Sequence, residues 1–163
     1  MMRALARFKR DARGAAAAEM ALILPLALAL MFTMFEGAYY IICEHRVVKG
    51  VRDAARYAAR HDLTNYACPG ASFTGDAGAI KNLARTGALT GGTANVPGWV
   101  DNDVSVTVTC ASNQGGIYAS NAGYAPKVSV STRVAYRSLM STLGFTQSTL
   151  LIGATAQSPV VGL

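Results

Sequence analysis

The hydrophobic pattern of the chain is dominated by one apolar run from Arg13 to Cys43, which only Glu19 and Glu36 interrupt. Inside it, the uncharged stretch Met20–Phe35 would form about 24 Å of helix at ~1.5 Å per residue. Because a bilayer core of ~30 Å needs about 20 helical residues, the run predicts a transmembrane helix over residues 15–43. Glu19 and Glu36 would then lie near opposite edges of the hydrocarbon, where a carboxylate costs least.

The pattern becomes amphipathic over residues 44–62, which we interpret as a stalk helix. Its small apolar positions recur with helical spacing, at Val47, Val48, Val51, Ala54, Ala55 and Ala58. Its basic positions fall on the opposite face, at Arg46, Lys49, Arg52, Arg56 and Arg60. No turn signal separates the stalk from the apolar run, so we expect one helix from about Ala15 to His61. The basic face is interpreted as solvated, with acidic partners or lipid head groups as the alternative.

Residues 63–163 predict a small domain with a second helix and a sheet. The helix is expected over Asp76–Ala88, with Asp76 near its start and glycines after its end. Three runs alternate apolar with polar residues or are simply apolar, namely residues 104–110, 127–136 and 150–157. Three strands in succession favour an antiparallel meander with the helices covering one face. The predicted fold class is therefore α+β.

The segments between these elements are expected to be loops. Residues 65–75 and 112–126 are rich in Gly, Ser, Asn or Pro and show no periodicity. Residues 138–143 are expected to form a short helix ended by Gly144.

The charge distribution argues against a nucleic-acid partner. The net charge is +6, but the first 13 residues contain five basic residues and one acidic residue. Most of the basicity therefore lies in a segment that resembles a targeting leader, assigned here to residues 1–14. The 20 residues after the apolar run also carry five Lys or Arg residues, so the positive-inside rule does not orient the helix.

The three cysteines, at positions 43, 68 and 110, lack the spacing of a zinc site. Cys68 and Cys110 flank the middle of the domain, which suits a disulfide in an oxidising compartment; two unrelated buried thiols are the alternative. Such a disulfide would favour a domain outside the cytoplasm. Cys43 is interpreted as a small apolar packing residue.

Few side chains suggest chemistry. His45 and His61 lack a suitably spaced nucleophile or carboxylate, so we expect no catalytic, metal or cofactor residues and no enzymatic activity. The pair Asp101 and Asp103 suits a solvated turn better than a calcium site. Three aromatic residues of the domain are interpreted as caps on a small core, with an adhesive surface as the alternative, at Trp99, Tyr118 and Tyr124.

A compact motif begins the apolar run: Gly14, four alanines from Ala15, then Glu19. A glycine leaves the backbone open to a protease, and the alanines keep the site slim. Glu19 would be the fifth residue of a chain cut after Gly14, where it can pair with an α-ammonium group in low dielectric. Pro25 removes one backbone donor and predicts a kink or weak point, although prolines are also common in membrane helices.

The patterns RGAAAAEMALILPL, FEGAYY and VRDAARYAAR, within residues 13–60, resemble the amino-terminal module of TadE-like proteins, the minor pilins or pseudopilins of tight-adherence (Tad/Flp) pili. Met20 and Ala18 replace an aromatic residue and a valine that are more usual there. The resemblance implies a pilin-like layout, cleavage after Gly14 by a prepilin peptidase, and an assembly role for Glu19. Glu36 is either a second assembly contact or a residue at the outer interface.

The resemblance also implies partners and a location. The partners would be the prepilin peptidase, other pilin and pseudopilin subunits, the inner-membrane assembly platform and the lipid bilayer. The chain would be a single-pass protein of the bacterial inner membrane with its carboxyl-terminal domain outside the cytoplasm. The alternative is an uncleaved, signal-anchored binding domain that does not polymerise.

Overall fold

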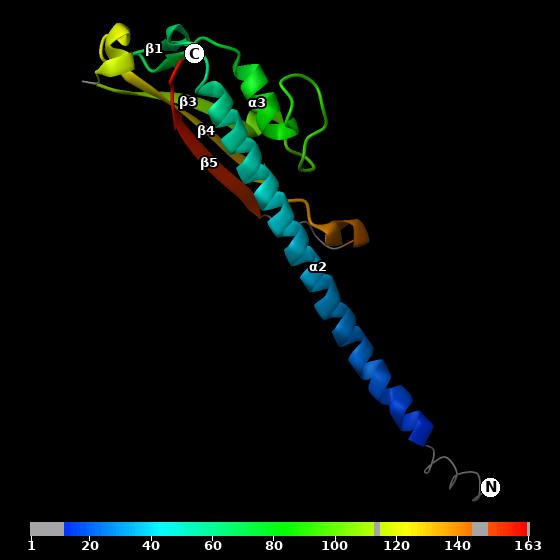
Figure 1. The fold of residues 1–163 in the computed structure, drawn as a ribbon. Coiled ribbons are helices and arrows are strands. Elements are labelled where there is room, and N and C mark those ends of the chain that lie inside the picture. The colour runs from blue at the N-terminus through cyan, green and yellow to red at the C-terminus, as the bar shows by residue number, and fades with distance from the viewer. Residues whose placement is uncertain (1–11, 113–114, 145–149, 163) are drawn as a thin grey trace, which may run out of the picture. The chain divides into compact units, whose positions relative to one another are not determined.

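The computed structural model describes residues 12–112, 115–144 and 150–162 of the 163-residue chain (Figure 1). The chain divides into two compact units, residues 1–38 and residues 39–163, and each is described by itself. Most of the predicted leader, residues 1–11, lies outside the described residues. The secondary structure combines one long helix, a second helix and a three-stranded antiparallel sheet, which confirms the α+β class.

Helix α2 runs over Ala12–Ala58, as one element (Figure 1). This confirms a single helix through the apolar run and the stalk, although it ends three residues before the expected His61. At its end the backbone tightens: the amides of Arg60 and His61 bond to the carbonyls of Tyr57 and Ala58 at 3.1 Å each. These three-residue bonds satisfy terminal carbonyls that an α-helix leaves open.

The sheet contains β3 (Val104–Ala111), β4 (Ala125–Ala135) and β5 (Leu151–Pro159) in the order β3-β4-β5. Both pairings are antiparallel, which confirms the predicted meander. One face is apolar and buried, at Val104, Val108, Val128, Val130, Val134 and Ile152. The other face carries Ser, Thr, Lys and Arg. Alternation along each strand therefore placed one apolar row on the core.

The second unit's part of α2 contributes the other half of the core. Its stripe is buried to 3% exposure or less, at Cys43, Val47, Val51, Ala54, Ala55, Ala58 and Ala59. Gly50 lies in the same stripe, and a Cβ there would overlap the carbonyl oxygen of Ala84. A glycine is therefore what lets α2 approach the second helix closely. Cys43 is a buried free thiol, as expected.

The second helix, α3, runs over Ala77–Thr86 and is capped at both ends. The Asp76 carboxylate accepts a hydrogen bond from the amide of Ala79 at 3.0 Å, an N-cap. Gly87 adopts the left-handed conformation that commonly ends a helix. The predicted helix is confirmed, with its end two residues earlier.

Two expected loops contain more structure than their composition indicates. Residues 63–75 form a 3₁₀ turn, η1 (Leu63–Asn65), and a small hairpin of β1 (Tyr66–Ala67) and β2 (Ser72–Phe73). Residues 112–126 include a 3₁₀ helix, η3 (Gly116–Asn121). Strands of two residues are too short to show periodicity, which explains why the sequence did not reveal them. The expected short helix before Gly144 is confirmed as η4 (Leu139–Leu143).

Candidate functional site

The first unit is a helix with an uncovered apolar surface. Side chains from Met20 to Phe35 are 39–79% exposed where they are large and apolar. Among the described residues, α2 is the one helix long and apolar enough to cross a membrane, with a mean hydropathy of 2.1 in its most apolar window and none of that window buried. Exposing apolar side chains to water at this density is unfavourable, so this surface suits an apolar environment such as a bilayer.

The Gly14–Ala15 bond lies inside the first turns of α2, because the helix begins at Ala12 rather than at the expected Ala15. Gly14 is exposed, and a Cβ there would meet no atom within 4 Å. Ala15 and Glu19 are exposed as well. The motif is therefore sterically open, near the start of the helix.

Pro25 and Glu36 both lie in α2, where Pro25 is exposed and Glu36 is partly buried. The helix continues through Pro25 without a break, so the kink predicted there remains a prediction. Thr33 satisfies its hydroxyl inside the apolar run by donating to the carbonyl oxygen of Ala29 at 2.8 Å, which is the usual solution for a hydroxyl on a helix surface. Glu36 is partly buried, whereas Glu19 is exposed.

The basic face of the stalk is exposed throughout, at Arg46, Lys49, Arg52, Arg56 and Arg60. Arg46 alone in this row has a hydrogen bond within the described residues, to the carbonyl oxygen of Asn95 at 3.0 Å. The row therefore lies opposite the buried stripe, as predicted.

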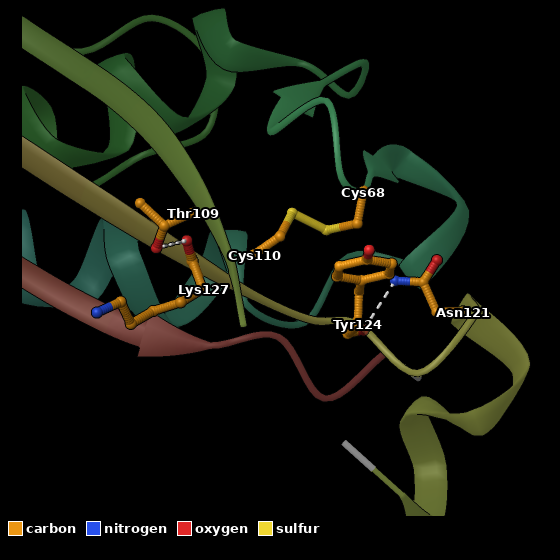
Figure 2. The surroundings of a disulfide bond; sticks show 6 residues. All are labelled: Cys68, Thr109, Cys110, Asn121, Tyr124 and Lys127. Carbon is orange, nitrogen blue, oxygen red and sulfur yellow. Dashed lines mark hydrogen bonds between the residues drawn. A yellow bond between two sulfur atoms is a disulfide. The ribbon is translucent and has the colours of Figure 1, made fainter. Parts of the chain in front are cut away.

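The disulfide joins Cys68 to Cys110, which confirms the predicted pair (Figure 2). Cys68 follows β1, and Cys110 lies near the end of β3, with their Cα atoms 5.9 Å apart. The bond ties the β1–β2 hairpin to the sheet. Closing a loop of 42 residues stabilises the fold by roughly 4 kcal/mol in the chain-entropy model.

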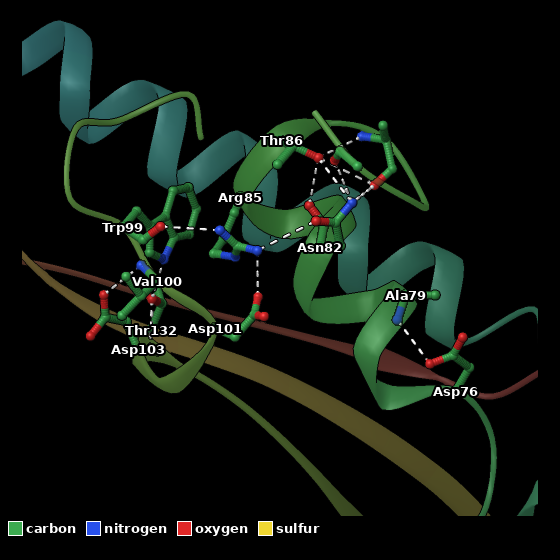
Figure 3. A network of polar contacts seen from close by, with 12 residues as sticks. Asp76, Ala79, Asn82, Arg85, Thr86, Trp99, Val100, Asp101, Asp103 and Thr132 are labelled. Atoms are coloured by element: carbon green, nitrogen blue, oxygen red, sulfur yellow. Dashed lines mark hydrogen bonds and ion pairs between the residues drawn. The ribbon is translucent and has the colours of Figure 1, made fainter. Parts of the chain in front are cut away.

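A polar network links α3 to the start of the sheet (Figure 3). The Arg85 guanidinium pairs with Asp101 at 2.5 Å and donates to the carbonyl oxygen of Trp99 at 3.2 Å. The Asp103 carboxylate accepts from the amide of Val100 at 3.0 Å. Asp101 is therefore paired with an arginine and Asp103 holds a backbone turn, which accords with the solvated-turn interpretation. Across the described ranges, no group of three or more His, Cys, Asp or Glu residues could hold a metal ion.

Trp99 is a core residue, only 1% exposed. Its indole N–H donates to the Thr132 hydroxyl at 3.0 Å, and that hydroxyl donates to the carbonyl oxygen of Asp103 at 2.8 Å. Tyr118 donates to the carbonyl oxygen of Val160 at 2.8 Å, and Tyr124 is partly buried. The core-cap interpretation is confirmed for Trp99, and an adhesive role for it is wrong.

Tyr66 was not identified from the sequence, although it secures the end of α2. Its hydroxyl donates to the carbonyl oxygen of Ala58 inside the core, and burial raises the pKa of Tyr66 to about 12. His61 packs edge-on between Tyr57 and Phe73, at 5.0 and 5.7 Å between ring centroids. Its Nε2 is buried and has no hydrogen-bond partner within the described residues. An isolated tyrosine in a loop-like segment gave no signal of such a role.

One comparison with known proteins gives a match, in the amino-terminal part of the chain. The family model described as TadE-like protein matches residues 14–56, which covers the candidate processing motif, the apolar segment and most of the stalk. Neither the search of curated proteins nor the search of solved structures gives a match.

Proposed function

We propose that the chain is a Tad pilus-associated protein, namely a minor pilin or pseudopilin, and the TadE-like segment at residues 14–56 supports this proposal. It is held in the membrane by α2 and is cleaved by a prepilin peptidase between Gly14 and Ala15. The observation that carries this proposal is the uncovered apolar surface of α2, directly after an open Gly–Ala motif. The same surface serves first in the bilayer and then against neighbouring subunits of a Tad/Flp pilus.

The proposed orientation places the folded unit outside the cytoplasm, on the periplasmic side of the inner membrane. Its disulfide supports this orientation, because disulfides form and persist in oxidising compartments. The proposed partners are the prepilin peptidase, other pilin and pseudopilin subunits, and the assembly platform of the inner membrane. The role is structural rather than catalytic.

Glu19 is proposed to set the axial position of the subunit during assembly. After cleavage it is the fifth residue of the chain, close to a newly formed α-ammonium group. Inside the apolar surroundings of a subunit bundle, a carboxylate needs a cationic partner, and the amino terminus of a neighbouring subunit supplies one. Pro25 and Glu36 would contribute further contacts along the same helix.

Amino-terminal sequencing of the mature protein tests the cleavage. In cells that contain the peptidase we expect the chain to begin at Ala15, and a Gly14→Leu variant should retain the leader. A Gly37→Leu variant is the matched control, because Gly37 is also exposed in α2 with no atom near its Cβ position. A wild-type chain that still begins at Met1 or Met2 would contradict the proposal and favour the uncleaved binding domain.

A second measurement separates assembly from processing. Glu19→Ala should be cleaved like the wild type but should be depleted in pili sheared from cells. A Glu44→Ala variant, which alters an exposed carboxylate in the second unit, should be incorporated normally. Equal recovery of Glu19→Ala and wild type in pili would refute the role given to Glu19.

A further inference from the structure

One end of the folded unit combines aromatic, basic and exposed apolar side chains. Tyr136, the residue after β4, packs its ring against Tyr39 and Tyr40 of α2, with centroids 6.0 and 5.1 Å apart. Its amide also bonds to the carbonyl oxygen of Leu150, just before β5, at 2.9 Å. These four residues, together with Leu151, define what we call the Tyr136 end.

Several large apolar side chains are exposed at the Tyr136 end. Leu139, Leu150 and Leu151 are 39%, 54% and 58% exposed. On α2, Ile41 and Ile42 are 51% and 47% exposed, although they belong to the folded unit. Apolar side chains that gather at one end of a small domain mark a site of interaction with a protein or a membrane.

The length of the apolar run favours the membrane, rather than another protein, as the partner of the Tyr136 end. Met20–Phe35 is shorter than the roughly 20 residues that a bilayer requires, so the membrane segment must extend beyond it. If it extends outward, it reaches Ile41 and Ile42. If it extends only toward Ala15, Tyr39 still follows Glu36 by about 4.5 Å of helix, within a head-group layer that is about 5–7 Å deep. Either way, the first residues of the folded unit lie at the membrane surface.

The charges near the Tyr136 end fit an anionic surface. Arg133 on β4 and Arg137 just after it are both exposed, and neither forms an ion pair within the described residues. Of the carboxylates on these elements, Asp103 caps a turn, Glu44 is exposed on α2, and the partly buried Glu36 precedes Tyr39 by three residues of the same helix. Tyrosines at the level of the head groups with arginines beside them are the arrangement that membrane proteins use at the bilayer interface.

We propose that the Tyr136 end is a membrane-seating surface: it rests on the outer leaflet of the anchoring bilayer, with its leucines in the interface and Arg133 and Arg137 on anionic phospholipid head groups. This inference rests on the membrane anchorage in the proposed function and adds a second contact with the bilayer. It orients the folded unit before assembly, and removal of the subunit from the membrane must break the contact.

Site-directed spin labelling of the full chain in nanodiscs that hold one copy each tests the seating. In a Cys43→Ala background, one label is placed at Leu151→Cys and the control label at Gln157→Cys. Both positions lie on the same face of β5 and pair with Ala135 and Ser129 of β4, about 20 Å apart along the strand. With anionic lipid present, we expect the label at 151 to be protected from a water-soluble nickel chelate and accessible to oxygen. The label at 157 should be accessible to the chelate.

Charge variants test the role of the arginines in the same assay. Arg133→Gln should lower the ratio of seated to unseated protein roughly fivefold in anionic discs, which corresponds to ~1 kcal/mol per basic residue at such a surface. Lys127→Gln is the matched control, because Lys127 is exposed on the same face of β4 at the opposite end, and it should have no effect. In zwitterionic discs the effect of Arg133→Gln should disappear.

The outcomes separate this inference from the proposed function. A chain that fails to enter nanodiscs contradicts the anchorage itself. A chain that enters but shows equal chelate access at 151 and 157 overturns the seating and leaves the anchorage intact. Protection at 151 only in discs with two copies would assign the surface to a neighbouring subunit and would also overturn the proposal. Fluorescence of buried Trp99 checks that each variant remains folded.

Discussion

The two parts of helix α2 differ in where their apolar side chains go. In the first unit, Leu22 is 79% exposed and Met34 is 72% exposed; in the second unit, Val47 and Ala54 are 0% exposed. The first part uses large residues around the whole helix, whereas the second uses one stripe of small residues opposite a basic face. Large apolar side chains are suited to contact with lipid chains. Small side chains are suited to close packing against a sheet and a second helix.

This contrast shows that one helix can carry two kinds of surface, which differ in side-chain size and in charge. Gly50 marks the extreme of close packing, since even a methyl group would overlap the carbonyl of Ala84. Gly37, thirteen residues earlier in the same helix, has open space around its Cβ position. The same Gly→Ala substitution should therefore affect stability differently at Gly50 and at Gly37, and a comparison of the two variants can measure the difference.

The largest expected difference comes from placing a carboxylate in each part. Val47→Asp should destabilise the folded unit by at least about 4 kcal/mol, because an unpaired charge would be buried in its core. Leu26→Asp should leave the unfolding of that unit unchanged but impair membrane insertion by about 2.5–3.5 kcal/mol. Denaturant titration followed by the single, buried tryptophan measures the first effect, and fractionation of cells measures the second. Equal losses of stability would contradict the contrast.

An intermediate effect is expected at the two glycines. Gly50→Ala should cost about 2 kcal/mol, since the added methyl forces α2 away from α3. Gly37→Ala should be neutral or should stabilise the helix by up to about 1 kcal/mol, because alanine favours the helix over glycine. Thermal unfolding of the two variants in detergent provides the comparison. A tolerated Gly50→Ala variant would show that the helix pair can separate at little cost.

The smallest effect is expected at Tyr66, whose hydroxyl donates to the carbonyl oxygen of Ala58 at the end of α2. Burial raises the pKa of Tyr66 from 10.0 to about 12, so its protonated form is favoured in the folded state. The stability that this confers is fully present below pH 10 and is lost as the pH rises toward 12. Between pH 9 and pH 11 the wild type should lose about 1 kcal/mol more than Tyr66→Phe. Parallel pH slopes of unfolding free energy for the two proteins would contradict this role of Tyr66.

The predictions from sequence succeeded where a period repeats over many residues. The stripe from Val47 to Ala58 and the alternation in Val104–Cys110 each extend over several repeats, and both faces were assigned correctly except at Val48, which is only partly buried. They failed where structure is short or held by distant contacts. The β1–β2 hairpin has two-residue strands, and η3 lies in a glycine-rich segment. Neither the role of Tyr66 nor that of Gly50 is visible without the partner that each one contacts.

The sequence by itself determined the membrane-length apolar run, the amphipathic stalk and the three strands. It also offered a candidate processing motif with Glu19, and it gave the Cys68–Cys110 disulfide as one of two alternatives that the structure then decided. These follow from local periodicity, from composition and from a family pattern that is continuous in the chain. Only the tertiary structure decided that Arg85 pairs with Asp101, that Trp99 lies in the core, and that Tyr136 brings the start of β5 beside Tyr39. Such contacts join residues far apart in the chain, and folding selects them through packing and burial, which no local pattern encodes.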